Sequence, residues 1–120
     1  MIEAESPVRG GSTLVSEAIA DAIEAMWSHD GSTSVHRLAP TTVFLRERRL
    51  VEWVFDDVES AVSEADIFRQ IRKRGIDVNL MFPIAELGRA HDEFWGSGLM
   101  LYGWIDRGDS HIRFTGPEIA

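Results

Sequence analysis

The sequence contains no cysteine, which excludes a disulfide framework, a thiolate zinc site and a cysteine nucleophile. No apolar run approaches the ~20 residues that a membrane-spanning helix needs. Residues 1–13 carry neither the basic start nor the apolar core of a targeting signal. A glycine-rich phosphate loop, a Gly-x-Ser-x-Gly elbow and a His-Glu-x-x-His pair are also absent. We therefore expect a cytoplasmic protein with no membrane partner and none of the common catalytic motifs.

Lysine is nearly absent as well, since Lys73 stands alone among 12 basic residues and the rest are arginine. This imbalance is typical of a GC-rich prokaryotic genome and indicates nothing about function. The formal net charge is −8, which argues against a nucleic-acid partner because phosphate backbones attract basic proteins. A chain of 120 residues fits a single domain with one core.

The order of periodic segments predicts an α/β domain over residues 12–115, between a flexible arm at 1–11 and a tail at 116–120. Helical and alternating patterns follow one another as α-β-β-β-α-β-α-β-β. Because strands separated by helices favour parallel pairing, we expect a mixed five-stranded sheet with helices on its faces. In chain order, we expect a helix over 12–27, strands over 35–38, 41–47 and 50–56, a helix over 63–74, a strand over 76–82, a helix over 86–95, and strands over 99–106 and 111–115.

One segment has two interpretations. Residues 41–47 and 50–56 are rich in β-branched and aromatic side chains, which indicates a hairpin. Arg48-Arg49 is a poor turn, however, since neither residue favours positive φ. The apolar positions also fit one long helix over 41–58. We favour the hairpin.

Carboxylates gather after the strand that ends near residue 56. Asp56, Asp57 and Glu59 stand where a parallel sheet usually keeps its ligands, outside the carboxyl ends of its strands. Clustered carboxylates can hold Mg²⁺ or Mn²⁺. The competing interpretation, which we favour, is that these acids cap the following helix and offset its positive end. Beyond such a cation, the sequence indicates no cofactor.

Over residues 12–106, the order of helices and strands resembles that of the restriction-endonuclease-like nuclease fold. That family carries an Asp on one strand and a Glu-x-Lys on the next. Here the tripeptide is Glu52-Trp53-Val54, with valine in place of lysine, and the preceding strand TTVFLRE supplies no Asp. The resemblance therefore implies a pseudo-nuclease, which has lost the ligand set and charge stabiliser of metal-dependent hydrolysis. An active nuclease or phosphodiesterase would have to use Glu52, Asp56 and Asp57.

Tryptophan and arginine supply the candidate interaction residues. Trp27 and Trp95 end predicted helices, and an exposed Trp is a frequent anchor of protein interfaces. Arg46, Arg48 and Arg49 lie at the tip of the predicted hairpin. The strand over 99–106 is apolar on both faces, so it is either internal or part of a dimer contact.

These features predict a non-catalytic protein-interaction or regulatory module, which binds a protein partner or associates with itself as a homodimer. A metal-dependent nuclease built on the carboxylates and a small-molecule-binding protein are the alternatives.

Overall fold

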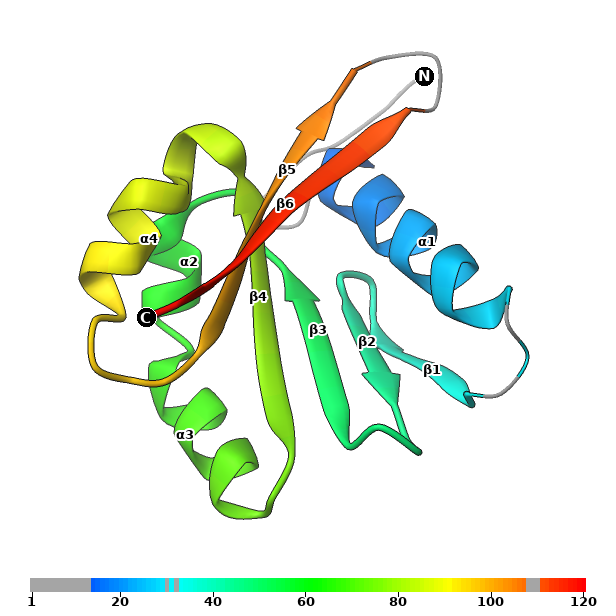
Figure 1. Ribbon diagram of the computed structural model, residues 1–120, viewed down its shortest axis with the longest axis horizontal. Coiled ribbons are helices and arrows are strands. Elements are labelled where there is room, and N and C mark those ends of the chain that lie inside the picture. The colour runs from blue at the N-terminus through cyan, green and yellow to red at the C-terminus, as the bar shows by residue number, and fades with distance from the viewer. Residues whose placement is uncertain (1–13, 30, 32, 108–110) are drawn as a thin grey trace, which may run out of the picture.

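The protein folds as three layers, in which one β-sheet separates a single helix from three others. The computed structural model describes residues 14–29, 31, 33–107 and 111–120. Helix α1 covers one face of the sheet, while α2, α3 and α4 lie together on the opposite face (Figure 1). The helices are α1 (Leu14–Ser28), α2 (Val58–Val62), α3 (Ala65–Lys73) and α4 (Leu87–Glu93), with a short 3₁₀ turn η1 (Ile84–Glu86) before α4.

The six strands lie in the sheet in the same order as in the chain. The second strand pairs antiparallel with both the first and the third. The fourth strand pairs parallel with both the third and the fifth, and the sixth pairs antiparallel with the fifth. Both crossovers between parallel strands pass over the face that α2, α3 and α4 cover. The strands are β1 (Val35–Ala39), β2 (Thr42–Leu45), β3 (Leu50–Val54), β4 (Asp77–Pro83), β5 (Met100–Asp106) and β6 (Ile112–Ile119).

The predicted α/β class, single domain and mixed sheet are confirmed, but the sheet has six strands rather than five. All six segments that the sequence predicts as strands, including the short edge strand over 35–38, pair within this one sheet. The hairpin of β2 and β3 is also confirmed, so the alternative of one helix over 41–58 is wrong. A four-residue loop, 46–49, replaces the expected two-residue turn, and Arg49 takes the positive φ of 50° that the turn requires.

Two further details differ from the sequence prediction. The helix expected over 63–74 is α3, and a separate short helix, α2, precedes it. The segment 116–120, predicted as a tail, continues β6 to Ile119, and Ala120 is buried with its amide donating to the carbonyl of Leu99. The predicted arm at 1–11 lies outside the described residues.

Strand β5 lies inside the sheet between β4 and β6, which explains why both of its faces are apolar. Leu101 faces the core under α2, α3 and α4, while Trp104 faces the core under α1. The sequence left open an internal strand or a dimer contact, and the internal position is the one observed.

Two separate cores follow from the alternation of side chains along β3, β4 and β5. One core joins Phe55, Phe68, Phe82 and Phe94 with aliphatic residues beneath α2, α3 and α4. The other joins Ile19 and Ile23 of α1 with residues of β2, β3, β4 and β5. No helix in the described ranges has both the length and the apolar character needed to cross a membrane.

Candidate functional site

A buried carboxylate, Glu52, lies on the α1 side of the sheet. Its side chain is 5% exposed in the middle of β3. The indole Nε1–H of Trp27 donates to Oε1 at 2.7 Å, and the amide Nδ2 of Asn79 donates to Oε2 at 2.8 Å. Asn79 is the neighbour of Glu52 in the parallel register of β3 and β4. Both carboxylate oxygens are thus held by neutral donors on separate elements.

The sequence of α1 places Trp27 over the sheet. Ile19, Ile23 and Trp27 recur every four residues, so they share one face of the helix and pack towards the sheet. Arg37 of β1 fixes the outer side of the helix through ion pairs to Asp21 at 2.8 Å and Glu24 at 2.6 Å. These contacts bring the last turn of α1 above Glu52.

Around Glu52 lies an open pocket of about 190 Å³, and its other walls are apolar or aromatic. An engineered cavity of about 150 Å³ accepts a benzene ring, so the volume suits one side-chain-sized group. The pocket is lined by Ile23, Met26, Trp27, Glu52, Met81, Tyr102 and Phe114.

Tyr102 reports the electrostatic character of the pocket. Burial raises the pKa of its phenol, and the negative charge of Glu52 raises that pKa further. Both effects disfavour the phenolate, because a second negative charge near Glu52 in a poorly solvated place is unfavourable. The charge of Glu52 therefore acts on the phenol of Tyr102 across the pocket.

Glu52 has no ion-pair partner among the residues that the structure describes. A carboxylate offers about four acceptor positions, so the two donors from Trp27 and Asn79 leave room for more. Buried charges in proteins are normally paired, since removing a charge from water is unfavourable. The arrangement can therefore receive a cation, and the rings of Trp27, Tyr102 and Phe114 suit a guanidinium or ammonium group.

Two candidate residues that the sequence assigned to different roles meet at this pocket, and a third, Arg48, lies against one of them. Glu52, expected only as a nuclease ligand, is its acid, and Trp27, expected as an interface anchor, is one of its walls. The guanidinium carbon of Arg48 lies over the Trp27 ring, 4.5 Å from the centroid. Arg46 is exposed on the same loop, and Arg49 is turned away to the carbonyls of Arg74 and Gly75 at 2.9 and 3.1 Å.

The three carboxylates of the acidic corner, which comprises Asp56, Asp57 and Glu59, each have a separate partner. Asp57 accepts from the backbone N–H of Ser60 at 2.8 Å and caps α2. The Ser16 hydroxyl donates to Asp56, and the guanidinium of Arg89 donates to Glu59. That last bond lowers the pKa of Glu59, together with the positive charge of Arg89.

Across the described ranges, no three His, Asp or Glu side chains gather as metal ligands do. The capping role expected for this corner is observed at Asp57. A Mg²⁺ or Mn²⁺ ion held by Asp56, Asp57 and Glu59 stays a prediction, and no contact among these residues favours it.

Trp95 lies at the surface, 74% exposed, after the end of α4. The His91 ring meets it edge to face, with centroids 5.2 Å apart, and His91 Nε2 lies 3.2 Å from the carbonyl oxygen of Ile119. Ile119 is itself 63% exposed. Trp95 is thus free to act as an interface anchor, although it is remote from the Glu52 pocket in the chain and in the fold.

Sequence reasoning missed Asn79 and Tyr102. A signal for the first was present, because Asn79 interrupts the otherwise apolar run VNLMF, and a polar residue inside a buried strand needs a partner. Tyr102 carried no comparable signal, since its position alternates normally within an apolar strand.

Comparison of the chain with known protein families, with characterised proteins and with solved structures found no match to any of them. The resemblance to the restriction-endonuclease-like fold therefore stays a prediction, and the function has to be argued from the site.

Proposed function

We propose that this protein is a non-catalytic interaction module that takes an arginine side chain of a partner protein into the Glu52 pocket. The observation that carries the proposal is a carboxylate, 5% exposed, held by two neutral donors at the wall of an open aromatic pocket. A guanidinium would supply the opposite charge that Glu52 lacks.

Arginine suits the pocket better than lysine for two reasons. Its planar guanidinium stacks on aromatic rings, and it is less strongly hydrated than an ammonium group. The ring of Trp27 already carries one guanidinium, that of Arg48, at 4.5 Å. A second ring, that of Tyr102, lines the pocket beside Glu52.

A protein partner is favoured over a small free ligand by what surrounds the pocket. Tyr102 also lines a second hollow of about 380 Å³, whose other walls include Asn79 and Met100 and, at the start of β4, Asp77. Met26, at the rim of the Glu52 pocket, is 61% exposed. Residues that flank an arginine in a peptide would meet the side chains of Met26 and Met100, with the polar groups of Asp77 and Asn79 close to Met100. The net charge of −8 favours approach of a basic segment.

The test is calorimetric titration with N-acetyl-arginine amide and with its uncharged analogue N-acetyl-citrulline amide. We expect the arginine compound to bind the wild type more tightly than the citrulline compound. Glu52→Gln keeps the shape and removes the charge, and it should weaken arginine binding about tenfold or more, as expected for a charged hydrogen bond. Glu93→Gln makes the same change on exposed α4 and should have no effect.

Equal binding of the two compounds, or unchanged binding to Glu52→Gln, would contradict the proposal. Sedimentation of the wild type and Glu52→Gln completes the test. A wild-type dimer that dissociates on this substitution would identify the partner as a second copy of the chain.

A further inference from the structure

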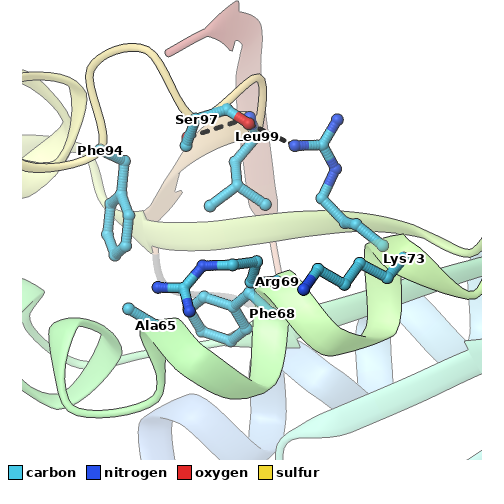
Figure 2. Close-up of a pocket in the computed structure, with 8 residues that line it drawn as sticks. Ala65, Phe68, Arg69, Lys73, Phe94, Ser97 and Leu99 are labelled. Carbon is cyan, nitrogen blue, oxygen red and sulfur yellow. Dashed lines mark hydrogen bonds between the residues drawn. The ribbon is translucent and has the colours of Figure 1, made fainter.

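A larger hollow lies on the opposite face of the sheet, between α3 and the loop that leads into β5. Its volume is about 520 Å³, which is within the 300–1,000 Å³ typical of small-molecule sites. Phe68, Arg69 and Lys73 come from α3, and Phe94, Ser97 and Leu99 stand across from them (Figure 2). Nothing in the proposed function uses this hollow.

The hollow combines an apolar floor with a basic rim. Ala65, Phe68, Phe94 and Leu99 supply the floor, and none of the described residues that line the site is acidic. The rim consists of the three cationic side chains of Arg69, Arg72 and Lys73.

The three cations differ in what they already bind. Arg69 pairs with Asp66 at 2.8 Å, and Arg72 donates to the carbonyl oxygen of Ser97. Lys73 has no hydrogen bond or ion pair with any residue in the described part of the chain. Compensation of the helix dipole explains cations in the last turn of α3. It does not explain an apolar hollow directly beside them.

The wall opposite α3 is fixed by hydrogen bonds. Gly98 N–H donates to the carbonyl of Ala120 at 3.0 Å, and Ala120 N–H donates to the carbonyl of Leu99 at 2.9 Å. Gly98 has a φ of 78°, and a Cβ there would come within 3.1 Å of the Arg72 guanidinium. The absence of a side chain at Gly98 therefore lets Arg72 lie close to the loop. The hydrogen bonds of this loop give the hollow a fixed wall opposite α3.

We propose that this hollow binds a small organic anion, with its apolar body on Phe68, Phe94 and Leu99 and its charged group at Lys73 and Arg69. A carboxylate, sulfonate or phosphate ester on an aromatic or aliphatic body has this chemistry. The protein as a whole carries a charge of −8, so a basic rim on an apolar hollow distinguishes this place from the rest of the surface.

The test uses two probes of equal shape, naphthalene carboxylate and naphthalenemethanol, titrated calorimetrically into the full chain. We expect the carboxylate to bind more tightly than the alcohol, with an affinity that falls as salt rises. Lys73→Gln should weaken carboxylate binding about fivefold, as for a partly exposed ion pair, and leave alcohol binding unchanged.

Two further variants separate this site from general surface attraction. Arg74→Gln makes the same charge change one residue along, outside the hollow, and should leave carboxylate binding unchanged. Ala65→Leu narrows the floor and should weaken both probes, provided that its thermal unfolding remains cooperative.

The proposal would be overturned by equal binding of the two probes, by equal effects of Lys73→Gln and Arg74→Gln, or by undiminished carboxylate binding in folded Ala65→Leu. Absence of carboxylate binding up to about 10 mM would also overturn it, since a millimolar Kd would be seen there. Cosedimentation with phosphatidylglycerol vesicles without naphthalene carboxylate binding would instead indicate an acidic membrane surface. None of these outcomes depends on Glu52.

Discussion

The indole Nε1–H of Trp27 donates to a carboxylate oxygen of Glu52, with nitrogen and oxygen 2.7 Å apart, and this bond joins the last turn of α1 to the middle of β3. The two residues are 25 positions apart in the chain. This hydrogen bond fixes the end of α1, which is the only helix on its face of the sheet in the described part of the chain. It also holds the Trp27 ring, a wall of the pocket, against the carboxylate of Glu52. Substitutions here should affect both stability and the electrostatics of the pocket.

The first prediction concerns the titration of Tyr102, which is the only tyrosine in the sequence. Its pKa is raised by burial and by the charge of Glu52. Glu52→Gln should therefore lower the pKa of Tyr102 towards its ordinary value of about 10. Ultraviolet absorbance of the phenolate, followed as pH rises, measures this directly because no second tyrosine contributes.

The sign of the linked stability follows from the same shift. Because the folded pKa of Tyr102 lies above the unfolded value, the folded state binds its proton more tightly. The stabilisation is complete below about pH 10 and is lost as pH rises through the folded pKa. Glu52→Gln should weaken this alkaline loss. An unchanged absorbance titration in Glu52→Gln would show that the carboxylate does not act on Tyr102.

The second prediction concerns Trp27→Phe. Phenylalanine keeps an aromatic wall but removes the donor, so Glu52 Oε1 loses its indole hydrogen bond. A buried polar atom left without its partner costs about 1–3 kcal/mol, and the free energy of unfolding should fall by that amount in urea denaturation. Trp95→Phe makes the same change at a side chain 74% exposed and should stay within about 0.5 kcal/mol of the wild type.

A double variant tests whether the two residues act together. Trp27→Phe combined with Glu52→Gln should be less destabilised than the sum of the single changes, because an amide oxygen suffers less than a carboxylate from the lost donor. Strict additivity would mean that the loss in Trp27→Phe comes from packing alone.

Much of the fold could be predicted from the sequence because local patterns determine it. Alternation over 50–56 and 76–82 predicted two neighbouring parallel strands, and β3 and β4 occupy those segments. The predicted last strand ends at 115, directly before Gly116 and Pro117, two residue types that weaken strand pairing. Pairing with β5 carries β6 through them to Ile119. Stabilisation by a neighbouring strand cannot be recognised from the local residue preferences of the segment itself.

The candidate site was less predictable, since it depends on which side chains share a face across different elements. Sequence reasoning singled out Glu52 and Trp27 separately, but it could not place them together, because the turn of α1 over the sheet is a tertiary feature. The acidic corner shows the converse. Asp56, Asp57 and Glu59 are adjacent in sequence, yet their partners Ser16, Ser60 and Arg89 lie on three different segments.

The third prediction separates a helix cap from a metal ligand at Asp57. Its Oδ1 accepts from Ser60 N–H at 2.8 Å, so Asp57→Ala should lower the free energy of unfolding by about 1 kcal/mol. Asn is an equally good cap, and Asp57→Asn should retain nearly the wild-type midpoint in thermal unfolding.

Millimolar Mn²⁺ provides the control for this experiment. If Asp57 acts only as a cap, Mn²⁺ leaves the midpoints of the wild type and Asp57→Asn equally unaffected. A rise of several degrees in the wild type, lost in Asp57→Asn, would establish a metal site at this corner and revive the nuclease alternative.

The fourth prediction concerns the backbone at Gly116, which carries β6 past a register shift against β5. Gly116 has a φ of 118°, and a Cβ at this position would stand 2.8 Å from the carbonyl oxygen of Leu101. That oxygen belongs to the backbone of an internal strand and cannot move aside. Gly116→Ala should therefore destabilise the protein by about 1–3 kcal/mol for the strained φ, with the steric clash adding to it. Chemical denaturation measures the loss.

Gly96→Ala is the matched control for this substitution. Gly96 also has a positive φ, 84°, but a Cβ there would meet no atom within 4 Å. Its substitution should show only the conformational penalty of about 1–2 kcal/mol. The excess loss in Gly116→Ala then measures the closeness of β6 to β5. If the two variants lose the same stability, β6 is not held against Leu101, and the strand would end near residue 115 as its sequence suggests.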